Sequence, residues 1–263
     1  MSGSLRRPLR IPACAWILAV AGVVALVPAA RADGAPKTLR FPASDTLTVT
    51  ADLYEPVGDA RAAPFVLLLH QAGSSRGEYR AIAPKLAARG LTCLAVDLRS
   101  GKSWGEVDNE TFTRAIAKGM KTTRDEALKD VDGVLAWRAA REYTGPLVVW
   151  GSSYSASLAF FIAHRHEDVR AIVAFSPGDY IAPEGSTLRE AKRIASPAVF
   201  ITGPMKERRA LQEIFDAIPA RRKKLFVQTD GVHGASTLDR SPAAAETWKQ
   251  VWAFLEAAGL AQP

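Results

Sequence analysis

A serine stands among small residues at the point where an apolar run ends. Residues 147–157 read LVVWGSSYSAS, so Gly151 lies two positions before Ser153 and Ser155 lies two positions after it. A serine hydroxyl becomes an effective nucleophile when a neighbouring base takes its proton. Small flanking residues allow the sharp strand-to-helix turn that makes such a serine accessible. The segment therefore predicts a nucleophile at Ser153, and a plain turn between a strand and a helix is the alternative.

His233 is the candidate for the base. It is one of four histidines in the chain and lies in the loop DGVHG, with glycines nearby on both sides, after the last predicted strand. His164 and His166 fall late in a predicted helix, where solvated or packed histidines are common. His70 directly follows a predicted strand, which favours a structural role. We therefore expect His233 to act as the general base and acid.

A carboxylate is expected to hold the imidazole in the correct tautomer. Glu207 is the first candidate, because it follows the predicted strand 198–202 in the segment ITGPMKERRA. Its alternative role is to place a negative charge in the first turn of a helix. Asp179, in SPGDY after the predicted strand 171–175, is the alternative acid. The sequence leaves the choice between these two carboxylates open.

Two backbone N–H groups are expected to stabilise the oxyanion that forms during acyl transfer. The N–H of Tyr154 stands at the start of a predicted helix, where backbone donors lack intrahelical partners. The loop HQAGSSRGEY, after the predicted strand 65–69, is expected to supply the second donor from Ala72. Three aromatic residues are candidates to line an acyl pocket, although simple packing is the commoner role: Trp104, Tyr154 and Tyr180.

Short, continuous apolar runs recur along the chain, which is typical of strands buried on both faces of a parallel sheet. They span residues 65–69, 92–96, 147–150, 171–175, 198–202 and 225–228. Residues 46–54 alternate in polarity like a half-buried strand and are expected to pair with the segment near 39–41. Helical spacing is found over residues 76–89, 124–140, 156–164, 206–218 and from 241 to 259.

This alternation predicts one α/β domain over residues 33–263, with a mostly parallel central sheet and helices on both faces. Active sites in such sheets lie at the carboxyl ends of the strands. The three candidate catalytic residues all follow predicted strands. Only about 22 residues separate the predicted strands that end at Phe175 and begin at Ala198. We therefore expect no large lid domain.

The N-terminus has the order of a secretory signal. Arg6, Arg7 and Arg10 precede the apolar stretch IPACAWILAVAGVVALVP, and Ala30-Arg31-Ala32 forms an A-x-A cleavage site. We expect residues 1–32 to be a signal peptide and the mature protein to be periplasmic or secreted. The alternative is an uncleaved anchor, because the apolar stretch approaches the length that spans a bilayer.

Charge and cysteine content exclude other classes of protein. The formal net charge of +7 includes four arginines in the first 32 residues, and without that segment the net charge is +3. The remaining basic clusters lack the aromatic residues and motifs of a nucleic-acid surface, so no nucleic-acid partner is expected. Cys93 is the only cysteine after the signal, so the mature chain has no internal disulfide.

Six segments together resemble the dienelactone-hydrolase-like group of the α/β-hydrolase superfamily: TADLYEP, LLLHQAGSSRGEY, LAVDLRSGKS, GSSYSAS, AFSPGDY and DGVHG. The resemblance covers nearly all of the mature chain. It implies a serine hydrolase that cleaves a carboxylic ester or related small acyl compound and needs no metal or organic cofactor. The implied roles are nucleophile for Ser153, general base for His233, acid for Glu207 and oxyanion donors for Tyr154 and Ala72.

The chain departs from the group's pattern at two places. Ser155 replaces the second glycine of G-x-S-x-G, and the acid loop has Lys206-Glu207 where the group has an aspartate. Two other functions therefore stay open. One is a catalytically silent protein that binds a ligand or partner in the same cleft, and the other is a peptidase acting on short peptides. Acyl preference and oligomeric state have no signal in the sequence.

Overall fold

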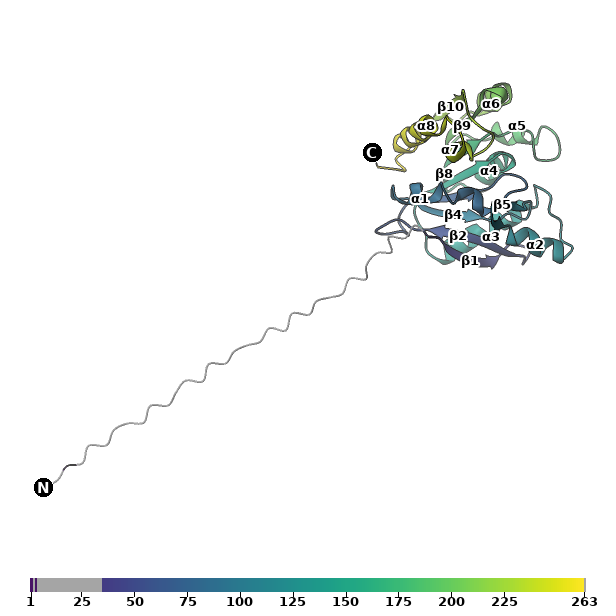
Figure 1. Cartoon of the computed structure of the whole chain (residues 1–263). Helices are drawn as coiled ribbons and strands as arrows, with labels where there is room; N and C mark the ends of the chain where they lie inside the picture. The colour runs from purple at the N-terminus through teal and green to yellow at the C-terminus, as the bar shows by residue number, and fades with distance from the viewer. Residues whose placement is uncertain (2, 4–34, 263) are drawn as a thin grey trace. The chain divides into compact units, whose positions relative to one another are not determined.

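A sheet of eight strands forms the centre of the molecule (Figure 1). The computed structural model describes residues 1, 3 and 35–262. The predicted signal peptide, apart from Met1 and Gly3, lies outside the described residues. Across the sheet the strands are ordered β1 (Lys37–Pro42), β2 (Thr48–Tyr54), β4 (Thr92–Val96), β3 (Phe65–Leu69), β7 (Leu147–Ser152), β8 (Val169–Phe175), β9 (Ala198–Pro204) and β10 (Lys223–Gln228).

The sheet is antiparallel at one side and parallel elsewhere. β2 pairs antiparallel with both β1 and β4, and the remaining neighbours are parallel. The predicted pairing of residues 46–54 with the segment near 39–41 is confirmed. Every residue of β3, β4 and β7 is buried, because helices cover both faces of the sheet. The prediction of a mostly parallel sheet with helices on both faces is also confirmed.

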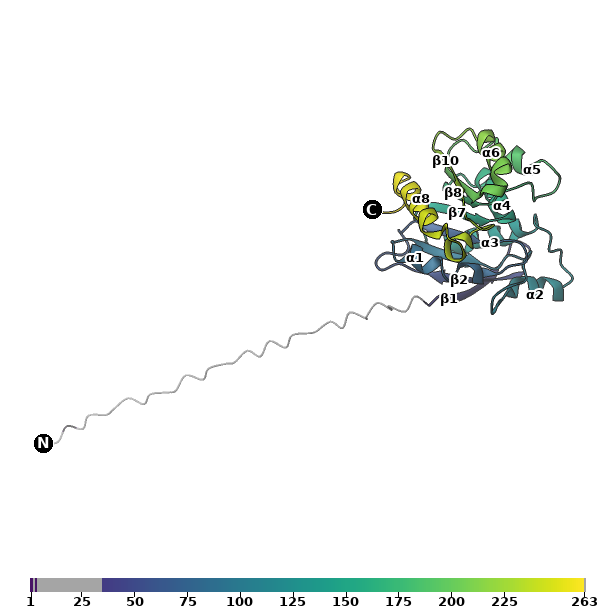
Figure 2. The same ribbon diagram turned by 45° about the horizontal axis from the view of Figure 1, so that its top comes forward.

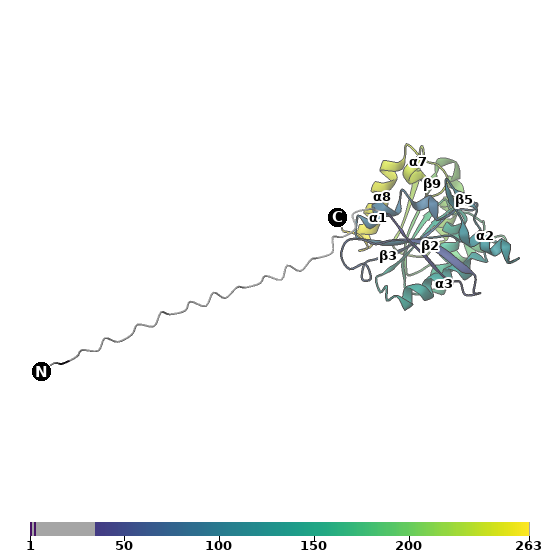
Figure 3. The ribbon, with the colours of Figure 1, turned by 60° about the horizontal axis from the view of Figure 1, so that its bottom comes forward.

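The helices form two layers, one on each face of the sheet (Figure 3). One hydrophobic cluster lies between the sheet and η1 (Arg76–Tyr79), α1 (Ala83–Ala87), α7 (Thr237–Arg240) and α8 (Ala244–Ala257). The other lies beneath α2 (Glu110–Ala117), α3 (Ala127–Ala140), α4 (Tyr154–Arg165), α5 (Ser186–Ala191) and α6 (Arg208–Ala217). In the described part of the chain, no helix is both long enough and apolar enough to cross a membrane.

The parallel register brings the site-bearing loops to one edge of the sheet. Leu69 at the end of β3 is paired with Gly151 of β7, and Ser152 is paired with Phe175 of β8. Phe175 is paired in turn with Thr202 of β9. The strands therefore end side by side, and the loops after β3, β7, β8 and β9 meet at the same rim.

The structure differs from the sequence prediction between the strands. The predicted helix over 76–89 is instead the 3₁₀ turn η1 followed by α1, because Pro84 lacks a backbone N–H and occupies the first turn of α1. The hairpin of β5 (Ser103–Trp104) and β6 (Val107–Asp108), and helices α2, α5 and α7, were not predicted. The β8–β9 connection contains only the six-residue α5, which lies beside α6 (Figure 2).

Candidate active site

Ser153 occupies a strained turn between β7 and α4. Its φ of 59° and ψ of −120° place a non-glycine residue in a region that costs about 1–3 kcal/mol. A hydrogen bond of 2.8 Å from Ser153 N to Phe175 O ties this turn to the neighbouring strand β8. The surrounding sheet therefore holds the serine at the strand's carboxyl end, with 9% of its surface exposed.

Gly151 is required by the close approach of β7 and α4. A Cβ atom at this position would lie 2.3 Å from Ser155 O and 2.4 Å from Ala156 N. Both of these are backbone atoms, so no side-chain movement can relieve the overlap. The first small residue of the GSSYS segment is therefore fixed by packing of the strand against the helix.

Ser155 strengthens the turn, although the family pattern has glycine there. Its Oγ donates a 2.6 Å hydrogen bond to Leu69 O and accepts one of 2.8 Å from Ser152 N. Leu69 ends β3, so the hydroxyl joins the turn to the strand that precedes the predicted oxyanion loop. The departure at Ser155 supplies two buried contacts that glycine cannot make.

The structure brings Ser153, His233 and Glu207 into one hydrogen-bonded chain. His233 Nε2 lies 2.7 Å from Ser153 Oγ, and His233 Nδ1 lies 2.8 Å from Glu207 Oε1. With Nδ1–H donating to the carboxylate, Nε2 is left free to accept the serine proton. Asp179, the alternative acid, is exposed and accepts a hydrogen bond of 2.6 Å from Gly185 N instead.

Glu207 lies at the end of the 3₁₀ turn η2 (Met205–Glu207), after β9. Burial raises the pKa of its carboxyl, but hydrogen bonds from His233 and Ser176 outweigh burial and hold the pKa below its ordinary value. The carboxylate is therefore ionised at neutral pH. An anion at this position favours the Nδ1–H tautomer and stabilises an imidazolium.

Ser176 is a site residue that the sequence prediction missed. It follows β8, has a φ of 54°, and its Oγ accepts a 3.0 Å hydrogen bond from Gly234 N. Its hydroxyl also hydrogen-bonds Glu207, so one side chain positions both the acid loop and the base loop. The available signal was its place directly after a buried strand, which is the criterion that selected Asp179 in the same loop.

The two predicted oxyanion donors both lie at the strand ends. Tyr154 is the first residue of α4 and Ala72 lies in the exposed loop after β3. Within residues 35–262, neither backbone N–H donates to another backbone carbonyl outside the regular elements. A developing oxyanion requires donors that are free to bind it, and the N–H of Tyr154 directly follows the candidate nucleophile in the chain.

His70 fixes the loop that carries Ala72. Its Nδ1 donates a 2.7 Å hydrogen bond to Gln71 O, and its Nε2 accepts one of 2.9 Å from Leu98 N. Burial lowers the pKa of the imidazole to about 4, so the ring is neutral. The structure places His70 in a structural role, as its position in the sequence indicates.

Tyr180 lies beside the candidate base, with its ring edge-on to His233 at 6.5 Å between centroids. The guanidinium of Arg124 lies 5.7 Å from the Tyr180 ring and donates a 3.0 Å hydrogen bond to Tyr180 O. The ring of Tyr154 is fully buried and its hydroxyl hydrogen-bonds Ser100. Trp104 packs under the guanidinium of Arg240. Of the three aromatic candidates, the structure shows Tyr180 in contact with the site.

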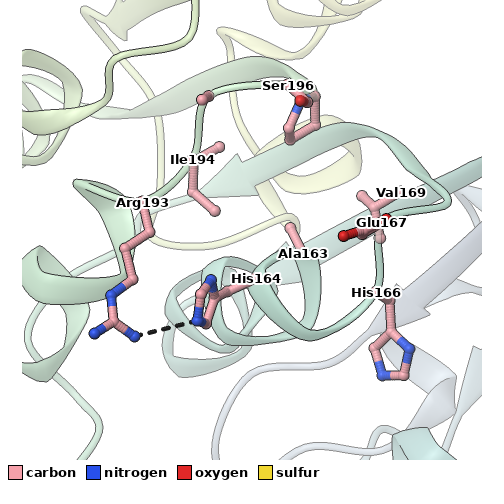
Figure 4. A pocket seen from close by; sticks show the side chains of 10 residues that line it. Ala163, His164, His166, Glu167, Val169, Arg193, Ile194 and Ser196 are labelled. Carbon is pink, nitrogen blue, oxygen red and sulfur yellow. Dashed lines mark hydrogen bonds between the residues drawn. The ribbon is translucent and has the colours of Figure 1, made fainter.

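The other two histidines line a pocket of about 420 Å³ at a different place (Figure 4). His164 Nε2 lies 3.1 Å from Arg193 Nη1, and His166 is a neighbour in the same wall. The pocket also contains Val169, which starts β8, so it lies at the amino end of the strands. In the described part of the chain, no cluster of three or more His, Cys, Asp or Glu residues is arranged to hold a metal ion.

A comparison with protein families gives one match. The family model described as "Serine aminopeptidase, S33" matches residues 60–228, which is more than half of the chain. The chain belongs to this family. The matched region runs from the segment before β3 to the end of β10, so it contains Ser153 and Glu207 and stops before His233. Membership confirms the prediction of an α/β-hydrolase and of a serine hydrolase.

Solved structures of several hydrolases have the same fold. An esterase of Pyrococcus furiosus is 19% identical with a TM-score of 0.66, over 84% of this chain and 92% of that chain. A dienelactone hydrolase of Anabaena variabilis is 16% identical with a TM-score of 0.64, over 84% and 98% of the two chains. Esterase 2 of Thermogutta terrifontis, phosphoramylated by tabun, is 14% identical with a TM-score of 0.66, over 87% and 97%. No curated protein sequence matches this chain.

Proposed function

We propose that this protein is a secreted or periplasmic serine hydrolase that cleaves small carboxylic esters through an acyl-enzyme on Ser153. The observation that carries the proposal is the continuous hydrogen-bonded chain from Ser153 Oγ through His233 to Glu207. The strained turn at Ser153 supports the proposal, as do the N–H groups of Ala72 and Tyr154, which have no backbone acceptor outside the regular elements among residues 35–262.

Acylation starts at Ser153. Its Oγ attacks the ester carbonyl carbon while its proton passes to Nε2 of His233. Glu207 stabilises the resulting imidazolium through Nδ1–H, and the N–H groups of Tyr154 and Ala72 hold the oxyanion. When the tetrahedral intermediate collapses, Nε2–H protonates the leaving alcohol and the acyl group stays on Ser153.

Deacylation uses the same groups, with water in the place of the alcohol. His233 removes a proton from a water molecule, and the resulting hydroxide attacks the acyl-enzyme carbonyl. The second oxyanion occupies the same pair of N–H donors. Collapse of this intermediate releases the carboxylic acid and returns the proton from His233 to Ser153. Each donor of the pair contributes on the order of 10²–10³-fold in kcat.

The surroundings of the site favour small substrates with apolar groups. The β8–β9 connection is short and contains one six-residue helix. Met205 and Val232 are large apolar residues that are 47% and 36% exposed, and they lie next to the segments that carry Glu207 and His233. An ester with short apolar groups would gain contact with this rim and would need no lid to open.

The N-terminal sequence supports export, since basic residues, an apolar stretch and an A-x-A site occur in the required order. The mature chain would then begin at Asp33. Mass spectrometry of the exported protein should find this N-terminus. Retention of residues 1–32 in a membrane fraction would support the anchor instead.

Peptide hydrolysis is the second candidate, because the matching family is described as a serine aminopeptidase family. The test is a panel of p-nitrophenyl and aryl esters of increasing acyl length, run beside aminoacyl p-nitroanilides on wild type and Ser153→Ala. We expect the wild type to hydrolyse short-chain esters and Ser153→Ala to lose at least about 10³-fold in kcat. Preferential turnover of the anilides would support the peptidase. A folded wild type inactive on both sets would support a silent binding protein.

A further inference from the structure

Glu78 is a buried carboxyl group that none of the proposed catalytic steps uses. It lies in η1, after the loop that carries Ala72, and 1% of the residue is exposed. Burial raises the pKa of this carboxyl to about 7, against hydrogen bonds from Ser152 and Gln71 that lower it. A group with this pKa is partly ionised at neutral pH. Its contacts suit the ionised form, because both oxygen atoms accept hydrogen bonds.

The contacts of Glu78 reach three separate loops. Oε2 accepts a 2.8 Å hydrogen bond from Gln71 N in the loop after β3. Oε1 accepts one of 2.6 Å from Ser152 Oγ at the end of β7. Ser152 Oγ in turn accepts a 2.8 Å hydrogen bond from Ala235 N in the loop after β10. Glu78, Ser152 and Ala235 are buried, and Gln71 is partly exposed.

Each of these partners lies one or two positions from a proposed catalytic group. Gln71 precedes the oxyanion donor Ala72, Ser152 precedes the nucleophile, and Ala235 follows His233 by two positions. We propose that Glu78 is a positioning residue, whose carboxylate sets the nucleophile, the base and one oxyanion donor relative to one another through Gln71 and Ser152. This inference rests on the proposed hydrolase function and adds a residue that controls its geometry.

The packing around Ser152 leaves little freedom for these loops to move independently. Gly234 has a φ of +78°, and a Cβ atom there would lie 2.6 Å from Ser152 Oγ and 3.3 Å from Gln71 Oε1. The base loop therefore lies directly on the two residues that Glu78 holds. A shift of Ser152 Oγ would displace the backbone that carries His233.

The side chain of Glu78 acts through geometry, since it touches neither the nucleophile nor the base. A glutamine in its place has the same shape but only one acceptor oxygen. The donor of either Gln71 or Ser152 then loses its partner and that loop relaxes. Misplacement of reacting groups by about 1 Å can cost on the order of 100-fold in rate.

The test compares three folded variants by steady-state hydrolysis of a short-chain p-nitrophenyl ester: Glu78→Gln, Ser152→Ala and their double mutant. We expect each single substitution to lower kcat by about 10- to 100-fold, with KM within about threefold of wild type. Because the two side chains share the hydrogen bond from Ser152 Oγ to Glu78 Oε1, the loss of kcat in the double mutant should be smaller than the product of the two single losses. Thermal melts identify the folded fraction.

Asp130→Asn is the matched control. Asp130 is also fully buried, and burial raises its pKa to about 6, but its carboxylate binds Arg99 and none of the three loops. We expect this substitution to lower the melting temperature and to leave the kcat of the folded protein near wild type.

Three results would overturn the positioning role. They are a folded Glu78→Gln protein with wild-type kcat, additive losses in the double mutant, or a loss of kcat in Asp130→Asn as large as in Glu78→Gln. If the wild type hydrolyses the ester and Ser153→Ala does not, such a result removes only the role of Glu78. If wild type and Ser153→Ala are equally inactive, the proposed function fails and the positioning role fails with it.

Discussion

The candidate triad depends on a short set of side chains that lie far apart in the sequence. Glu207 contacts His233 from 26 positions away, and Ser153 contacts His233 from 80 positions away. Residue types and their places after strands were sufficient to select Ser153 and His233. They did not separate Glu207 from Asp179, since both follow strands. The choice depends on where each carboxylate points, and only Glu207 reaches Nδ1 of His233.

At the residue scale we predict a large kinetic loss in Glu207→Gln. The amide can present its N–H₂ group to the imidazole, which favours the tautomer in which Nε2 is protonated and unable to accept the serine proton. Loss of the orienting carboxylate should lower kcat on the order of 10³- to 10⁴-fold with little change in fold. Steady-state kinetics and circular dichroism measure the two effects.

Asp179→Asn is the control for that substitution. The Asp179 carboxylate lies in the neighbouring loop and accepts a hydrogen bond from Gly185 N instead of one from His233. Its kcat should stay within about threefold of wild type. The acid of the triad would be reassigned to Asp179 if Asp179→Asn lost its activity while Glu207→Gln remained active.

At the scale of the element, the β7–α4 turn is defined by two different constraints. Gly151 is needed because a Cβ atom at this position would lie 2.3 Å from the backbone of α4. Ser155 is retained by hydrogen bonds to Leu69 O and Ser152 N, which join the turn to β3. The motif alone indicated that the residue at 155 must be small. It did not indicate that a hydroxyl there has buried partners.

We predict that restoring the family's glycine at this place destabilises the protein. Ser155→Gly removes the donor to the buried Leu69 carbonyl and adds backbone freedom in the first turn of α4. The free energy of unfolding should fall by about 1–3 kcal/mol. Urea denaturation of wild type, Ser155→Gly and Ser155→Ala measures this change. Ser155→Ala removes the hydroxyl without adding the backbone freedom of glycine. If Ser155→Gly is as stable as wild type or more stable, the hydroxyl has no structural role.

At the scale of the whole molecule, the sheet was the easiest part to predict. The strands 65–69 and 92–96 match the structure at both ends, because an apolar run buried on both faces has clear limits in the sequence. β8 begins at Val169 instead of 171, since the exposed Arg170 interrupts the run. Short helices such as α5 and α7 have too few turns for a periodic pattern. Glu78 and Ser176 were missed because their roles arise from contacts between distant loops.

The buried Glu78 should also make the stability of the molecule depend on pH. Its pKa is about 7 in the folded state and near the ordinary 4.5 when the chain unfolds. Between these two pKa values the folded state binds the proton more strongly than the unfolded state does. The contribution of Glu78 to the free energy of unfolding therefore decreases as the pH rises from about 4.5 to about 7. Nearby Asp239 on α7 acts in the same direction, because its charge also raises the Glu78 pKa.

Urea denaturation of wild type and Glu78→Gln at pH 5 and pH 7.5 measures this contribution. The stability of Glu78→Gln relative to wild type should increase from the lower to the higher pH, because the glutamine has no proton to lose. A difference between the two proteins that stays constant with pH would show that Glu78 keeps an ordinary pKa.

The most direct measurement is the site of covalent modification by a fluorophosphonate. The wild type, treated at neutral pH and digested, should give one modified peptide with the adduct on Ser153, because His233 Nε2 lies 2.7 Å from that hydroxyl. Ser153→Ala should stay unmodified, and Glu207→Gln should react much more slowly. A folded wild type that remains unmodified, or an adduct on a different serine, would contradict the assignment of Ser153 as the nucleophile.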